Sequence, residues 1–83
     1  MRLPRDLSGK DLAKRLEVFG YRSIRQTGSH IRLTTLEQGE HHLTIPQHDH
    51  LRIGTLAGIL SDVAFHFNLN REEVFQQLYP RKK

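Results

Sequence analysis

Two short runs of alternating apolar and polar residues constrain the fold of this chain more than any other feature. The runs cover residues 30–36 and 41–45, and an earlier, less regular run covers residues 21–26. The turn signals Thr27-Gly28 and Gln38-Gly39 separate the three runs. Alternation sends successive side chains to opposite faces of a strand, whereas a sheet covered on both faces would show continuous apolar runs. The pattern therefore predicts a three-stranded antiparallel meander with one covered face and one open face.

The three runs differ in how cleanly they divide their side chains between these faces. The first run is irregular, because Tyr21 and Ile24 do not fit a period of two, and we expect a bulge or an early strand boundary there. Pro46 has no N–H to donate to a sheet ladder and closes the third run. The covered face should carry Ile31, Leu33, Leu43 and Ile45, and the open face His30, Arg32, Thr34, His42 and Thr44.

A helix is expected before the sheet. Ser8 is placed to cap it, with Asp11 three residues later as a short-armed form of the capping box. Gly20 should end the helix after Phe19, as glycine does just past a helix. The buried face, at helical spacing, consists of Leu12, Leu16 and Phe19.

Two further helices are expected after the sheet. The first begins near Thr55 and ends near Asn68. Gly58 inside it costs about 1 kcal/mol relative to alanine, so close packing or a close approach of the backbone should compensate there. Asn70 caps a short last helix, which Pro80 stops. The apolar stripe of the longer helix consists of Leu56, Ile59, Leu60, Val63 and Phe67.

The expected fold class is α+β, in the order α-β-β-β-α-α, with the helices packed on one face of the sheet. Eighty-three residues allow a single domain, residues 1–83, with a short basic tail at residues 81–83. The sequence has no cysteine and no stretch approaching the roughly 18 apolar residues that a bilayer span needs. We therefore expect a soluble cytoplasmic protein with no membrane partner.

Positive charge is concentrated toward the two ends of the chain. The net charge is +4, but residues 1–25 hold seven basic and three acidic groups, whereas residues 26–80 hold three basic and six acidic groups. Residues 81–83 are all basic. One interpretation is a one-sided attraction to polyanions such as nucleic acid, and the other is a solvated helix face with a free tail.

Three short motifs follow one another along the chain. Gly28-Ser29-His30 opens the second run, Ile45-Pro46-Gln47-His48 ends the third, and residues 54–60, GTLAGIL, open the longer helix. In this order and spacing, from about Leu7 to Phe75, the chain resembles the HicA (YcfA-like) family of messenger-RNA interferase toxins. The resemblance implies a fold like that of double-stranded-RNA-binding domains. It also implies that the chain is the toxin of a type II toxin–antitoxin pair.

The resemblance implies that His30 is the catalytic residue of an endoribonuclease. RNA can be cleaved without metal when a base removes the proton of a ribose 2′-OH, which attacks the adjacent phosphate, and an acid protonates the leaving 5′-oxygen. Imidazole suits either role, because its ordinary pKa of about 6.5 lies near working pH. Arg32, on the same side of the strand, could clamp the phosphate. From the residues alone, a hydrogen-bonding role for His30 at a strand end stays an alternative.

The RNA-binding surface is expected to combine basic residues with motif residues. Charge and position favour phosphate contacts by Lys10 and Lys14 on the first helix and by Arg32. Gly54 and Thr55 leave backbone N–H groups at a helix start that can hold a phosphate, although plain capping explains them equally well. The remaining expected contacts, taken from the motifs, are Gly28, Ser29 and His48.

A metal site is not expected. Four further histidines lie within ten residues, at positions 41, 42, 48 and 50, and the pair His48-x-His50 could chelate a transition metal. However, His41 and His42 are adjacent and point to opposite faces of a strand, and no cysteine or well-spaced carboxylate completes a site. We therefore expect no metal and no cofactor. His66 is expected at the surface or in the last turn of the longer helix.

The resemblance implies two partners, messenger RNA and a HicB-like antitoxin that masks His30, so a hetero-oligomer is expected. Two other functions suit the same fold. One is an RNA-binding module without catalysis, and the other is an interaction domain that docks a protein on the open sheet. A neighbouring small reading frame that encodes an acidic partner would favour the toxin over both.

Overall fold

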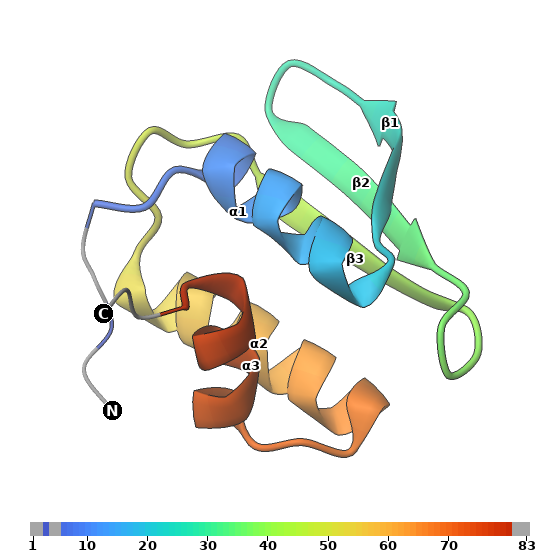
Figure 1. The fold of residues 1–83 in the computed structure, drawn as a ribbon. Coiled ribbons are helices and arrows are strands. Elements are labelled where there is room, and N and C mark those ends of the chain that lie inside the picture. The colour runs from blue at the N-terminus through green and yellow to red at the C-terminus, as the bar shows by residue number, and fades with distance from the viewer. Residues whose placement is uncertain (1–2, 4–5, 81–83) are drawn as a thin grey trace.

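The computed structural model describes residue 3 and residues 6–80, and the predicted basic tail at residues 81–83 lies outside this part of the chain. The predicted order α-β-β-β-α-α and the α+β class are confirmed, with a short 3₁₀ segment added after the first helix. Figure 1 shows α1 lying across the sheet, with α2 and α3 packed beside it. The elements are α1 (Gly9–Arg15), η1 (Leu16–Phe19), β1 (Arg22–Gln26), β2 (His30–Thr35), β3 (His41–Pro46), α2 (Ile53–Phe67) and α3 (Arg71–Leu78).

The first helix begins where its capping residue predicted. The Ser8 Oγ accepts a hydrogen bond from the Asp11 N–H at 3.0 Å. The predicted single helix is in fact two segments, because α1 ends at Arg15 and the chain tightens into the 3₁₀ helix η1. Gly20 ends η1 with a φ of 84°, a left-handed conformation that glycine adopts without strain. The predicted inner residues Leu12, Leu16 and Phe19 are all buried.

The sheet is an antiparallel meander in the order β1-β2-β3. Burial alternates along β2 and β3 as predicted, and α1 and α2 pack on the face that carries the buried residues. β3 extends one residue further than predicted, to Pro46, whose partner across the sheet is His30. A proline fits at this strand end, where no further ladder N–H is needed. The buried residues of the two strands include Ile31, Leu33, Leu43 and Ile45.

The irregularity predicted in the first run is a bulge in β1. Ser23 pairs with Leu33 and Arg25 pairs with Arg32, which leaves Ile24 as an extra residue on β1. An extra residue changes the face on which the following side chains lie. Arg25 is thereby placed on the same face as Arg32.

One apolar core joins the helices to β2 and β3, whereas every residue of β1 is exposed. β1 therefore contributes surface, and its pairing with β2 holds it in place. The fully buried side chains of the core include Leu12, Leu16, Leu33, Ile45, Leu56, Leu60, Val63, Val74 and Leu78.

The two later helices follow the predicted pattern with one shifted boundary. α2 begins at Ile53, two residues before the predicted start, so Gly54 and Thr55 lie inside its first turn. The capping box of α3 is complete, because the Asn70 Oδ1 accepts from the Glu73 N–H at 2.8 Å and the Glu73 carboxylate accepts from the Asn70 N–H at 3.0 Å. Of the helices in the described residues, none is long and apolar enough to cross a membrane.

Two helical glycines have opposite surroundings. A Cβ at Gly9 would collide with the carbonyl oxygen of Pro46, so glycine lets α1 approach the end of β3. A Cβ at Gly58 would meet no described atom within 4 Å, and the residue is exposed. The prediction that close packing compensates for Gly58 is therefore wrong within the described residues.

Candidate active site

His30 is the first residue of β2, and the preceding turn fixes its backbone. Its N–H donates to the Thr27 Oγ1 at 3.1 Å, and its carbonyl accepts from the Thr27 N–H at 2.9 Å. The side chain is exposed, and its Nδ1 lies 3.1 Å from the Ser29 Oγ. Within residues 6–80, no group is hydrogen-bonded to Nε2. One ring nitrogen is thus free, on a residue whose backbone is held on both sides.

Main-chain hydrogen bonds hold the loop after β3 against this turn. The Gln47 N–H donates to the Ser29 carbonyl at 2.8 Å, and the Gly9 N–H donates to the His48 carbonyl at 2.9 Å. The side chain of His48 stays exposed, and among the described residues a Cβ on Gly28 would meet no atom within 4 Å. Main-chain hydrogen bonds therefore bring the first two motifs together at one end of the sheet.

Arg32 shares the open face with His30. Its Nη1 lies 3.4 Å from the Thr44 Oγ1 on β3, and its side chain is exposed. Two residues along a strand span roughly 7 Å, so the long guanidinium side chain can reach a phosphate that His30 also contacts. The residues predicted for proton transfer and for phosphate clamping thus lie side by side.

Lys10 and Lys14 lie elsewhere. Both are exposed on α1, which packs on the opposite face of the sheet from His30. They line a groove between α1 and the edge strand β1, together with Ser23 and Gln26. The predicted RNA contacts therefore divide into a group on the open face and a group on the helical side.

Gly54 and Thr55 lie at an uncapped helix start. The first hydrogen bond of α2 runs from the Leu56 N–H to the Arg52 carbonyl at 2.9 Å, and the Arg52 side chain makes no capping bond. The N–H groups of Ile53, Gly54 and Thr55 precede this bond and have no acceptor inside the helix. Within the described residues, no side chain thus caps the start of α2.

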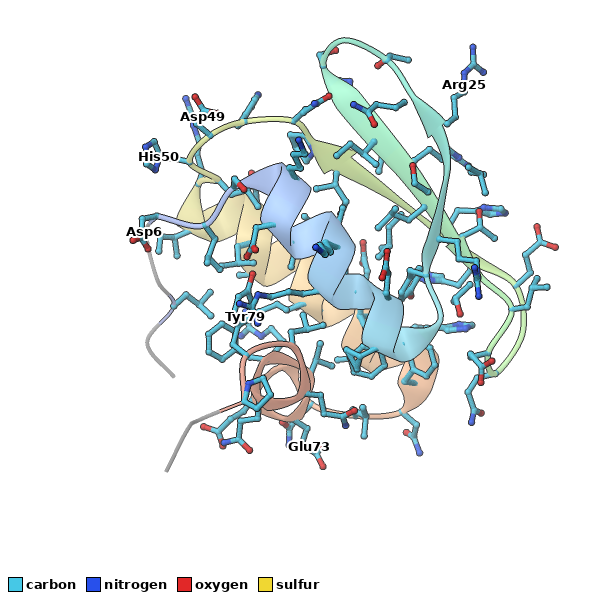
Figure 2. All side chains as sticks on the ribbon, turned by 45° about the horizontal axis from the view of Figure 1, so that its top comes forward. Asp6, Arg25, Asp49, His50, Glu73 and Tyr79 are labelled. Carbon is cyan, nitrogen blue, oxygen red and sulfur yellow. The ribbon has the colours of Figure 1, made fainter. Side chains whose placement is uncertain are left out.

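Two arginines that the sequence alone did not single out also face the open side. Arg22 pairs with Thr34 and Arg25 pairs with Arg32, and residues paired across antiparallel strands point to the same face. Figure 2 shows Arg25 extending from β1 into solvent. The odd apolar spacing of the first run signalled the bulge, but only the strand register shows which side chains the bulge redirects.

The other histidines of β3 are engaged in contacts. The Nδ1 of His42 lies 2.7 Å from the Thr34 Oγ1, and its Nε2 lies 2.8 Å from the Glu40 carboxylate. The Nδ1 of His41 lies 2.7 Å from the hydroxyl of Tyr21, which is fully buried. Burial raises the pKa of Tyr21 to about 12, so this hydroxyl keeps its proton at neutral pH. Burial and the neighbouring histidines lower the pKa of the His41 ring.

His66 lies in the last turn of α2, as predicted, but it is half-buried and has a structural role. Its Nε2–H donates to the carbonyls of Glu37 and Gly39 at 2.9 and 3.1 Å. Its ring stacks on that of His41 with centroids 4.5 Å apart. These contacts tie the turn between β2 and β3 to α2.

No group of three or more His, Asp or Glu side chains is placed to hold a metal ion within the part of the chain that the structure describes. His48 and His50 are both exposed on the loop after β3. Figure 2 shows His50 and the neighbouring Asp49 pointing outward from this loop.

Comparison with known protein families gives a match over the region that carries this site. The family model described as "HicA toxin of bacterial toxin-antitoxin" matches residues 9–64. That span contains α1, the whole sheet and most of α2. No curated protein and no solved structure matches the chain. His30 and the three arginines of the open face all lie inside the matched span.

Proposed function

The chain belongs to the HicA toxin family of bacterial toxin–antitoxin systems, and we propose that it is an endoribonuclease that cleaves messenger RNA and so inhibits translation. The observation that carries this proposal is the exposed ring of His30. Its Nε2 has no hydrogen bond within residues 6–80, and it stands beside Arg32 on an open face. A general acid or base needs such a free nitrogen within reach of the substrate.

The proposed reaction is an internal transfer of the phosphodiester. A base takes the proton of a ribose 2′-OH, and the oxygen attacks the adjacent phosphorus. The bond to the 5′-oxygen breaks, and an acid protonates that oxygen, which leaves a 2′,3′-cyclic phosphate and a free 5′-hydroxyl. The Nε2 of His30 serves one of these two proton transfers. Arg32 binds the phosphate and offsets the charge that builds up on its oxygens.

The proposed RNA surface extends beyond these two residues. Lys10 and Lys14 add positive charge from the helical side, and the N–H groups at the start of α2 offer a second place for a phosphate. A titration in which RNA affinity does not depend on salt would contradict a phosphate-binding surface. The other proposed contacts are Gly28, Ser29, His48, Gly54 and Thr55.

The proposed reaction needs no metal ion, because His30 serves one of the proton transfers and Arg32 clamps the phosphate. The test is cleavage of RNA by the purified protein in excess EDTA. We expect an unchanged rate and products that end in a cyclic phosphate. Activity that is lost in EDTA and restored by magnesium or zinc would contradict this mechanism. RNA that binds but is never cleaved would identify a binding module instead.

We also propose that a HicB-like antitoxin neutralises the toxin by covering the open face of the sheet. This face carries the exposed His30 and positively charged groups that suit an acidic partner. The chain expressed alone should arrest growth, and co-expression with the antitoxin should restore it. A stable complex in which His30 still reacts with diethyl pyrocarbonate as fast as in the free chain would contradict masking.

A further inference from the structure

Three arginines stand on the open face of the sheet without acidic partners. Arg22, Arg25 and Arg32 are exposed, and none of the ion pairs found within residues 6–80 includes any of them. Arg25 lies directly opposite Arg32 across β1 and β2. Like charges in this relation are destabilising. No contact in the described sheet offsets this repulsion, so the arrangement favours binding of an anion.

The bulge in β1 produces this arrangement. In a regular strand Arg22 and Arg25 would point to opposite faces, because they are three residues apart. The extra residue, Ile24, returns Arg25 to the face of Arg22. No residue of β1 is buried, so the bulge does not serve the core. Bulges beside functional sites redirect side chains in this way.

The arginines and His30 form a line that runs along the strand direction of β1 and β2. Arg22 lies level with Thr34, Arg25 lies level with Arg32, and His30 comes two residues before Arg32 on β2. Each step of two residues advances roughly 7 Å. β1 is an edge strand and all its residues are exposed, as are Arg32 and His30, so the line of positive charge is open to solvent along its length and ends at His30.

The helical side of β1 offers a weaker phosphate site. Lys10 and Lys14 share their groove with Glu17, whose carboxylate offsets part of their charge. A guanidinium binds phosphate through two parallel hydrogen bonds, whereas an ammonium acts as a point charge. The RNA backbone that passes His30 is therefore held better by groups on the open face of the sheet.

We propose that Arg22, Arg25 and Arg32 form a phosphate track that holds the backbone of single-stranded RNA and leads it to His30. A line of guanidinium groups on the adjacent β-strands β1 and β2 can follow one RNA backbone. This arrangement suits single-stranded RNA better than a duplex. This inference rests on the proposed nuclease function and adds Arg25 to it as a positioning residue. Arg25 binds a phosphate next to the one that is cleaved and takes no part in proton transfer.

The binding test uses His30→Ala protein, so that the RNA probe stays intact. A fluorescent single-stranded RNA is titrated at several salt concentrations against Arg25→Gln and Arg71→Gln in that background. Arg71 is the matched control, because it is an exposed arginine on α3, away from the sheet. Arg25→Gln should weaken binding by about tenfold or more and lower the salt slope by about 0.7, as loss of one charged phosphate contact does. Arg71→Gln should change affinity by less than about threefold.

The cleavage test uses the active chain. Arg25→Gln should raise KM by about tenfold with a much smaller change in kcat, because it removes binding energy rather than a proton-transfer group. Arg25→Lys should recover part of the loss, since it keeps the charge but not the planar fork. The melting temperature of Arg25→Gln should not fall, because the substitution removes the like-charge pair with Arg32.

The outcomes separate this inference from the proposed function. RNA binding that depends on Arg25, with no cleavage by the wild type, would leave the track standing and overturn the nuclease. Cleavage that is equally sensitive to Arg25→Gln and Arg71→Gln would overturn the track and leave the nuclease standing. A duplex held through Arg25 as tightly as a single strand would overturn the single-strand assignment. Absence of RNA binding would overturn both proposals.

Discussion

The two ends of the sheet are held by different kinds of contact. At the end that carries His30, the backbone makes the connections, with the Gln47 N–H on the Ser29 carbonyl and the Gly9 N–H on the His48 carbonyl. These bonds occupy main-chain groups only. The side chains of Ser29, His30 and His48 at this end remain exposed.

At the opposite end, side chains make the connections. The Tyr21 hydroxyl binds the His41 ring, and His66 binds two carbonyls of the turn between β2 and β3. Histidine is thus structural where its ring is bonded to other elements of the fold, as in His41 and His66. It is available for chemistry at His30, where the Nε2 has no hydrogen bond within residues 6–80. The contacts of the ring, rather than the residue type, distinguish His30 from His41 and His66.

The contact of α1 with the backbone-held end should be sensitive to added volume at Gly9. Gly9→Ala places a methyl group against the Pro46 carbonyl and should destabilise the fold by about 1–3 kcal/mol, as overpacking does. Gly58→Ala, the matched control, adds a methyl group in open space and should stabilise by about 0.5–1 kcal/mol. Urea unfolding followed by circular dichroism measures both. Equal effects of the two substitutions would show that α1 does not rest on the end of β3 through Gly9.

The side-chain end should lose stability without losing activity. Tyr21→Phe removes the hydroxyl that is hydrogen-bonded to His41 and should cost about 0.5–1.5 kcal/mol, the net value of a typical hydrogen bond. The rate of RNA cleavage per folded molecule should not change, because this contact lies at the other end of the sheet from His30. Unfolding curves and cleavage rates on the same preparation test both statements. A folded Tyr21→Phe protein with impaired cleavage would break the division between the two ends.

The side-chain end should also respond to acid. Burial and the neighbouring histidines lower the pKa of His41 in the folded chain, so the unfolded chain takes up the proton more readily. Stability that is present above the ordinary histidine pKa of about 6.5 is then lost as the pH falls through the lowered value. The melting temperature of the wild type should fall between about pH 8 and pH 5, and that of His41→Gln should fall less. Identical pH profiles for the two proteins would contradict this role of His41.

The fold could be predicted from the sequence because its signals are local. Alternation over residues 30–36 and 41–45 depends only on strand geometry, and it gave both the meander and its open face. The capping box at Asn70 and the left-handed Gly20 are likewise determined within a few residues. The start of α2 was placed two residues late, because Arg52 makes no side-chain cap there.

The candidate site could be predicted only in part, because its remainder depends on contacts between distant segments. The position of His30 on a strand followed from its own neighbours. The face of Arg25 depends on the pairing of β1 with β2, which fixes Ile24 as the extra residue. The separation of Lys14 from His30 depends on the face of the sheet that α1 covers. Neither relation has a signal within one short stretch of sequence.

The most direct test of the account compares RNA cleavage by His30→Ala and His42→Ala. Both histidines are exposed on the open face, but His42 is bonded to Thr34 and Glu40, whereas the His30 Nε2 is free within residues 6–80. His30→Ala should change stability by no more than about 0.5 kcal/mol and lower the cleavage rate by about 10²- to 10⁴-fold. His42→Ala should cleave at close to the wild-type rate. A folded His30→Ala protein that cleaves RNA as fast as the wild type would contradict the assignment of His30 as the catalytic residue.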